Sequence, residues 1–196
     1  MTSLQVHTSN PATTMQEFID NAKESGKEIT WGTSGAATMH ATIGHIFFDT
    51  HGIPHKKVPF KGGSKARAAL VSQSVEAVFG GVNTVVGFEK DIRALASAGA
   101  ERDPMAPDLS TFSEQGTDGI DFTGLMCLFG AAGVPDEVKE DVGAAIAHIA
   151  DLKGYQKYMS KNDLASFYTD SATATAAQDT MFEVMGPVVK EIIANQ

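Results

Sequence analysis

The stretch that most constrains the fold runs from Ile29 to His40, where a short strand pattern passes into a turn of small residues and then a helix pattern. Ile29 and Trp31 alternate with polar neighbours as in a strand, and the helical pattern starts at Ala36 and continues to about His51. Strands and helices joined in this way build layered α/β folds.

The same alternation of strand and helix patterns covers the first hundred residues. The Thr14/Glu17 capping box opens a helix that Gly26 ends. The remaining predicted segments are strands at 4–7, 57–60, 74–79 and 92–96, and helices at 64–71 and 83–89. This order predicts an α/β fold in which a parallel-dominated sheet is flanked by helices, because parallel strands need helical crossovers.

The last third of the sequence reads as mostly helical. Pro135 at a first helical position opens a helix to about Ala150, and Ser171 or Thr173 caps a final one. The other predicted segments are a helix at 155–162 and strands at 122–129 and 165–168. We expect these helices to pack on another part of a protein.

Composition limits the function. The chain has 196 residues, is 42% hydrophobic, and carries a net charge of −9, which argues against nucleic acid as its main partner. One cysteine, Cys127, excludes a disulfide within the chain. Neither a membrane-spanning run nor an export signal stands out, and no cofactor motif is expected.

A ligand site is expected where two loops meet. In an open α/β sheet, ligands bind beyond the carboxyl ends of the strands. The turn after Trp31 leads into a helix N-terminus, whose free amides and positive dipole favour an anion, although Thr33 or Ser34 as a plain helix cap remains an alternative. The predicted ligand-binding residues are Thr33, Ser34, Gly35, Ala36, Ala37, Thr38, Gly80, Gly81 and Asn83.

Two other chemistries fit parts of the sequence. The run from Gly32 to Ala36 is close to the G-x-S-x-G nucleophile elbow, so a serine hydrolase using Ser34 with a downstream histidine such as His148 is an alternative. Histidines and a carboxylate also cluster along the chain, but without a metal-binding spacing motif, and no metal is expected. That cluster comprises His40, His45, Asp49, His51 and His55.

One basic cluster stands out in this acidic chain. Its members are Lys56, Lys57, Lys61, Lys65 and Arg67. We interpret it as a solvated face, with Lys61 as a candidate for steering anions toward the cleft.

An ordered set of short motifs resembles the periplasmic solute-binding proteins of the tripartite tricarboxylate transporter family. Individually the motifs are common, but their order and spacing match over essentially the whole chain. They are Pro11 to Glu17, Thr33-Ser34-Gly35, Gly44 to Phe47, Val58-Pro59-Phe60-Lys61-Gly62, Val75 to Phe79, Arg93 to Ala96, Pro107 to Gly116, and Gly124 to Pro135.

The resemblance implies a two-lobed receptor that does no catalysis. It implies capture of a small carboxylate, a di- or tricarboxylate or an aromatic acid, and delivery to a membrane permease. It places the family's ligand-holding loops at 33–38 and 80–83. Where the family usually has a histidine and an aspartate, this chain has Ala41 and Gly80.

The resemblance also implies that the chain starts where the family's second lobe begins. Residues 8–121 are then a complete ligand-binding lobe, and residues 1–7 and 122–196 belong to an incomplete other lobe. Family membership implies the periplasm, whereas the lack of a signal peptide fits the cytoplasm. Unpartnered C-terminal helices predict self-association, and a truncated remnant that binds nothing is a further alternative.

Overall fold

The computed structural model describes residues 1–121, 124–162, 164, 166 and 168–194, without the side chains of residues 191–193. The chain separates into two compact units. One comprises Met1–Gly124 with Pro187–Gln196, and the other comprises Leu125–Gly186.

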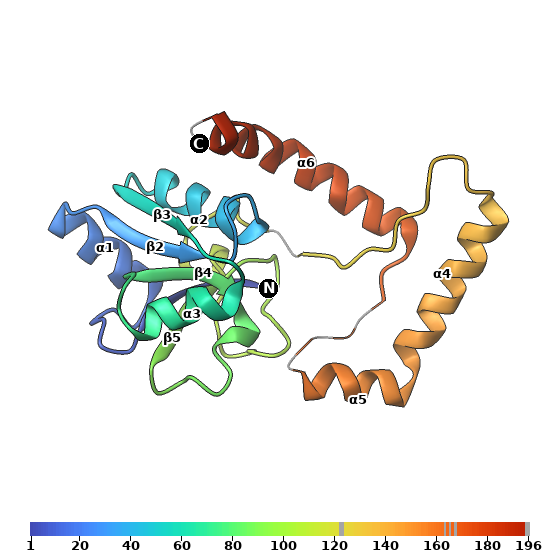
Figure 1. Ribbon diagram of the computed structural model, residues 1–196, viewed down its shortest axis with the longest axis horizontal. Coiled ribbons are helices and arrows are strands. Elements are labelled where there is room, and N and C mark those ends of the chain that lie inside the picture. The colour runs from blue at the N-terminus through green and yellow to red at the C-terminus, as the bar shows by residue number, and fades with distance from the viewer. Residues whose placement is uncertain (122–123, 163, 165, 167, 195–196) are drawn as a thin grey trace. The chain divides into compact units, whose positions relative to one another are not determined.

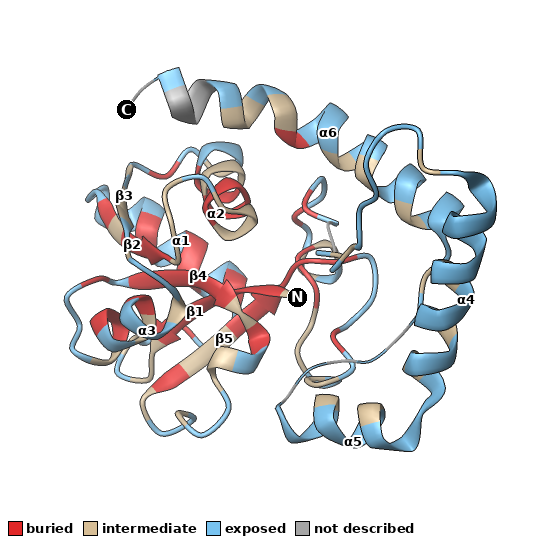
Figure 2. Cartoon of the chain, turned by 45° about the vertical axis from the view of Figure 1, so that its right-hand side comes forward, coloured by how far each residue is buried: buried red, intermediate tan, exposed pale blue. Residues whose placement is uncertain are grey.

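The first unit is built on the sheet seen in Figure 1, and its five strands, all labelled in Figure 2, have the order β3-β2-β4-β1-β5. β2 pairs in parallel with both β3 and β4, while β1 pairs antiparallel with β4 and β5. The parallel-dominated α/β sheet is thus confirmed, with β1 as the exception. The strands are β1 (Thr2–His7), β2 (Ile29–Thr33), β3 (His55–Pro59), β4 (Ala77–Gly81) and β5 (Ile92–Ser97).

The position of β1 corrects the expected grouping of residues 1–7 with another lobe. β1 lies inside this sheet, and both of its faces are covered. Leu4 and Val6 are fully buried on one face, and Ser3 and Gln5 are fully buried on the other. A strand with two buried faces belongs in the interior of a layered sheet, and β1 lies between β4 and β5.

Three helices flank the sheet: α1 (Met15–Ser25), α2 (Met39–Thr50) and α3 (Gly63–Val71). The predicted capping box at the start of α1 is confirmed, because the Thr14 side chain accepts from the amide of Glu17 and the Glu17 side chain accepts from the amide of Thr14. Gly26 ends this helix in the left-handed conformation. Two 3₁₀ turns follow, η1 (Val82–Thr84) and η2 (Ser113–Gln115). The helix predicted at 83–89 is therefore wrong beyond one short turn.

Successive residues of β4 show which helix covers which face of the sheet. Phe79 packs against Trp31 and against Phe47 of α2, with ring centroids 5.4 and 5.5 Å apart. The neighbouring Val78 belongs to an apolar cluster with Ala66, Ala69 and Leu70 of α3. The buried sheet thus lies between two helical layers, and the buried residues concentrate in its strands (Figure 2).

The second unit contains α4 (Asp136–Asp151), α5 (Lys153–Lys161) and most of α6 (Ser171–Ala194). Helices were expected in all three places. The strand predicted at 122–129 is wrong over residues 124–129, which form no strand, while 122 and 123 lie outside the described residues. Of the strand predicted at 165–168, residues 165 and 167 lie outside them, and 166 and 168 are not in a strand. That 122–196 belong to an incomplete second lobe stays a prediction.

Within the described part of the chain, no helix combines the length and the apolar character needed to cross a bilayer.

Gly44 lets α2 approach the sheet closely, and this generates a stability prediction. A Cβ at Gly44 would lie 2.5 Å from Trp31 Cζ3 and 2.9 Å from Phe79 Cδ2, both fully buried. Gly44→Ala is expected to lower the free energy of unfolding by about 1–3 kcal/mol through overpacking, despite alanine's better helix propensity. Urea unfolding followed by the fluorescence of Trp31, the single tryptophan, measures it.

The control is Gly63→Ala at the start of α3, where a Cβ would meet only Thr84 Cγ2 at 3.8 Å. Equal stability of the two variants would contradict the proposed role of Gly44.

Candidate functional site

Two loops lie at the same edge of the sheet because β2 and β4 are parallel neighbours. β2 ends at Thr33 and β4 ends at Gly81. The antiparallel β1 starts at this edge, with Thr2 opposite Gly81. This is the position at which open α/β sheets bind ligands.

A cavity of about 180 Å³ lies between these loops and the start of α3. Of the nine residues predicted to bind ligand, Ser34, Gly80, Gly81 and Asn83 line it. The other lining residues are His40, Gly63, Ala66, Val78, Phe79 and Thr84. The structure therefore brings part of the predicted set together, and its role in binding stays a prediction.

The remaining five predicted residues hold or form the loop beside the cavity. Thr33 is fully buried, and its Oγ1 lies 3.4 Å from Thr38 Oγ1. Gly35, Ala36 and Ala37 form the bend between these two threonines and do not line the cavity.

Thr38 is the N-cap of α2, which corrects the expectation that the helix starts at Ala36 with Thr33 or Ser34 as its cap. Its Oγ1 accepts a hydrogen bond from the amide of Ala41. In the described part of the chain, no oxygen accepts a hydrogen bond from the backbone amides of residues 35–40. The loop therefore presents unused donors at a helix N-terminus, the arrangement that favours an anion.

His40 lines the cavity from the first turn of α2. Its Nδ1 lies 2.7 Å from Thr2 Oγ1, which fixes the ring against the start of β1. Burial lowers the pKa of His40, so the imidazole is neutral at neutral pH. The adjacent Ala41 is fully buried.

A buried polar network beside the loop that follows β4 was not predicted from the sequence. Gln5 Nε2 lies 2.9 Å from Ser3 Oγ, 3.0 Å from the carbonyl oxygen of Gly81 and 3.0 Å from Thr84 Oγ1, so its two N–H groups are shared among three acceptors. Thr84 Oγ1 in turn donates to the carbonyl of Gly81 at 2.7 Å. These bonds hold the loop after β4 from its buried side, where Ser3 and Gln5 lie. No local signal reveals them, because Gln5 lies 76 residues from Gly81 along the chain.

Three of the five residues in the histidine cluster converge. One ring nitrogen of His45, a carboxylate oxygen of Asp49 and one ring nitrogen of His55 all lie within 4.8 Å of one another. The two Nε2 atoms lie 3.2 and 3.0 Å from the carboxylate of Asp49. His40 and His51 lie apart from this group, bonded to Thr2 and Thr117.

The hydrogen bonds of His55 favour a structural role over a metal site. The fully buried Trp31 donates its indole N–H to His55 Nδ1 at 3.0 Å. A neutral His55 must then carry its proton on Nε2, where it faces Asp49. A metal would need the lone pair of Nε2, which would put a proton on Nδ1 against the indole N–H. The hydrogen-bonded series Trp31–His55–Asp49 therefore provides an acceptor for the buried indole N–H of Trp31.

The backbone at Ser34 lacks the features of a nucleophile elbow. Such an elbow is a strained strand-to-helix turn with the serine at its apex. Among the described residues, Gln73 is the only non-glycine with positive φ. α2 starts at Met39, five residues after Ser34, rather than directly behind it. The geometry thus removes the main support for the hydrolase alternative.

Comparison with known proteins identifies related sequences. The family model described as "Tripartite tricarboxylate transporter family receptor" matches residues 1–193. The "UPF0065 protein in gbd 5'region" of Cupriavidus necator is 27% identical over 170 residues, which are 86% of this chain and 51% of that protein. The chain therefore spans about half the length of this curated relative.

Solved structures share the fold at low identity. A TctC solute binding protein from Polaromonas has a TM-score of 0.72 at 19% identity, covering 100% of this chain and 66% of its own. R. palustris Rpa4515 with adipate has a TM-score of 0.73 at 20% identity, and the match covers 99% of this chain and 62% of the Rpa4515 chain. MatC from Rhodopseudomonas palustris with bound malate has a TM-score of 0.72 at 19% identity, and the match covers 97% of this chain and 66% of the MatC chain.

The hydrogen bond from Trp31 to His55 generates a second prediction. His55→Phe keeps an aromatic ring beside Trp31 but removes the acceptor of its buried N–H. We expect the free energy of unfolding to fall by about 1–3 kcal/mol, the cost of one unpaired buried donor. Urea unfolding followed by Trp31 fluorescence measures it, and Lys56→Phe at the exposed next position is the control. A His55→Phe protein as stable as the control would show that this bond contributes nothing.

Proposed function

This chain belongs to the tripartite tricarboxylate transporter receptor family, and we propose that it binds a small organic carboxylate as the solute-binding component of an uptake system. The occupant is a di- or tricarboxylate or an aromatic acid. Binding is non-covalent, no reaction is catalysed, and a membrane permease receives the solute. The proposed location is the periplasm, where a receptor of this kind meets its solute.

The observation that carries the proposal is the pairing of unused amides with a small cavity. The amides of residues 35–40 have no acceptor in the described part of the chain, and Ser34, Gly80 and Gly81 line the adjacent space. A carboxylate accepts such hydrogen bonds without covalent chemistry. The cavity of about 180 Å³ is smaller than the roughly 300–1,000 Å³ typical of drug-sized ligands, which favours a small solute.

The relatives support the same ligand class. Two of the structures that share this fold hold adipate and malate, and both ligands are small dicarboxylates. The solutes of those proteins serve here as the first probes for this chain.

Calorimetric titration with adipate, malate, succinate, citrate and benzoate tests the proposal. We expect one of them to bind saturably and to raise the melting temperature, because a ligand bound only by the folded state stabilises it. Ser34→Ala should raise the Kd about tenfold by removing a charge-assisted hydrogen bond. Ser64→Ala on the exposed part of α3 is the matched control. No binding of any probe would support the alternative of a remnant that does not bind.

We further propose that the second unit self-associates through one face of α4. Val138, Val142, Ile146 and Ile149 recur at helical spacing there and are 38–46% exposed. No residue of α4 is buried. An uncovered apolar stripe of this kind favours contact with another apolar surface.

Light scattering after size-exclusion chromatography, over a range of concentrations, tests self-association. We expect a mass above the 20.7 kDa of one chain that decreases on dilution. Ile146→Glu should shift the protein toward the monomer, while Ala144→Glu, about 200° around the helix, should not. A wild-type monomer at all concentrations would rule the proposal out.

A further inference from the structure

Two basic side chains bond to backbone carbonyls in the two loops that flank the cavity. Lys57 Nζ donates to the carbonyl of Ala36 at 3.0 Å, in the loop between β2 and α2. Arg67 Nη1 donates to the carbonyl of Thr84 at 3.3 Å, in the turn after β4. Each loop of the proposed site therefore has its own cationic contact.

These two residues differ from the other members of the basic cluster. Lys56, Lys61 and Lys65 are exposed, as expected for a solvated face, whereas Lys57 and Arg67 are half-buried. Burial lowers the pKa of Lys57, because the ammonium is partly shielded from water where it contacts the loop. The expectation of one solvated face is thus wrong for these two residues.

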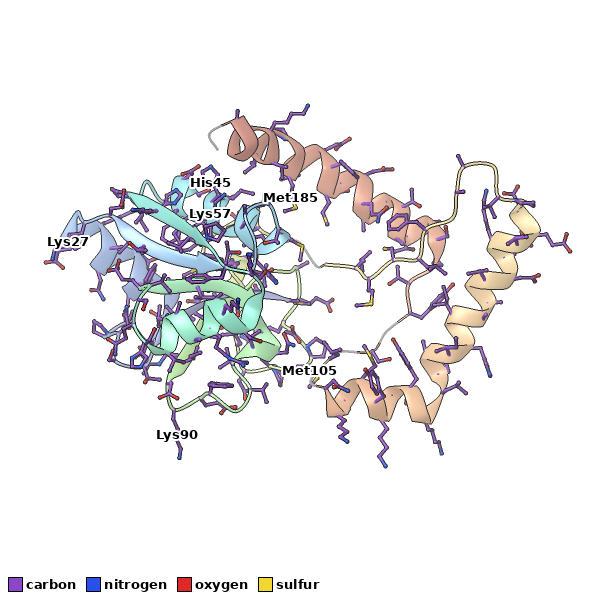
Figure 3. The ribbon with its side chains drawn as sticks, viewed as in Figure 1. Lys27, His45, Lys57, Lys90, Met105 and Met185 are labelled. Atoms are coloured by element: carbon purple, nitrogen blue, oxygen red, sulfur yellow. The ribbon has the colours of Figure 1, made fainter. Side chains whose placement is uncertain are left out.

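The two cations approach from opposite faces of the sheet. Lys57 pairs in register with Trp31, so it lies on the face that α2 covers, in the same region as His45 (Figure 3). Arg67 belongs to α3 on the other face, where its guanidinium stacks 3.9 Å from the ring centroid of Phe88. Stacking holds the planar group in one orientation.

A bond to a carbonyl also fixes the peptide that contains it. The peptide group is planar and trans, so the carbonyl of Ala36 and the amide N–H of Ala37 point in opposite directions. By holding the carbonyl, Lys57 turns that N–H away from itself and keeps it among the unused donors of the loop. The ammonium also offsets the negative end of a carbonyl that would repel an anion.

We propose that Lys57 and Arg67 are positioning residues that hold the two ligand loops in an anion-binding conformation and add positive potential beside the cavity. This inference rests on the proposed carboxylate binding for its effect on affinity. Its effect on loop order is independent of any ligand.

Four single methionine variants, with Lys57→Arg as a fifth variant, separate positioning from net charge. Lys57→Met and Arg67→Met each remove one positive charge and one carbonyl contact. Lys56→Met and Lys65→Met remove the same charge from the neighbouring exposed positions in β3 and α3. Lys57→Arg restores a charged donor, and circular dichroism confirms that each variant is folded.

Affinity is measured by calorimetry with adipate and malate at low salt and at about 0.5 M salt, where surface charges are largely screened. We expect the Kd to rise about tenfold for Lys57→Met and Arg67→Met at both salt concentrations. The two control variants should change it by less than about twofold, with the difference lost at high salt. Equal effects in all four variants would overturn positioning in favour of net charge.

Hydrogen exchange without ligand provides the second measurement. The amides of Ala41 and Thr42, which bond to Thr38 at the end of the first loop, should exchange faster in Lys57→Met, with partial recovery in Lys57→Arg. The amide of Val85, which bonds to the carbonyl of Val82 in the second loop, should exchange faster in Arg67→Met. Unchanged exchange in both loops would overturn the proposal even if a carboxylate binds. Faster exchange in a protein that binds no carboxylate would refute the proposed function while leaving the positioning intact.

Discussion

The contact of α2 with the sheet at Gly44 is the constraint on which the rest of the first unit depends. The absence of a side chain at Gly44 brings α2 onto the rings of Trp31 and Phe79, one from each of two parallel neighbours. This contact sets how closely α2 lies against the sheet, while the N-cap Thr38 sets where the helix and its free amides begin. The aromatic core and the candidate site thus share one cause, since the helix that closes the core also presents the donors.

Support for the site comes from several elements that never touch the ligand in our proposal. β1 contributes Ser3 and Gln5 below the loop after β4, while β3 and α3 contribute the two cations. Backbone amides are weakly selective ligands by themselves, so their orientation determines what they bind.

Local chemistry made much of the fold predictable. The pair Thr14 and Glu17 and the glycine at 26 delimit α1 in sequence as they do in the structure. The start of α2 was harder, because Thr33, Ser34 and Thr38 all offer a hydroxyl and only the path of the chain selects Thr38. The site was half predictable for the same reason: strand ends indicate the loops, whereas the bond from Trp31 to His55 and the network around Gln5 depend on tertiary contacts between distant segments.

The interior position of β1, between β4 and β5, also affects how the chain folds. β1 pairs only with β4 and β5, from Ala77 onward, so its partners follow about seventy residues behind it. During synthesis, the segment that will lie between β4 and β5 must wait, with its apolar residues uncovered, until these two strands have emerged. Such non-local pairing is slow and vulnerable to aggregation. β1 is therefore the strand of this sheet that waits longest for its partners, since β2 pairs with β3 only about twenty residues later.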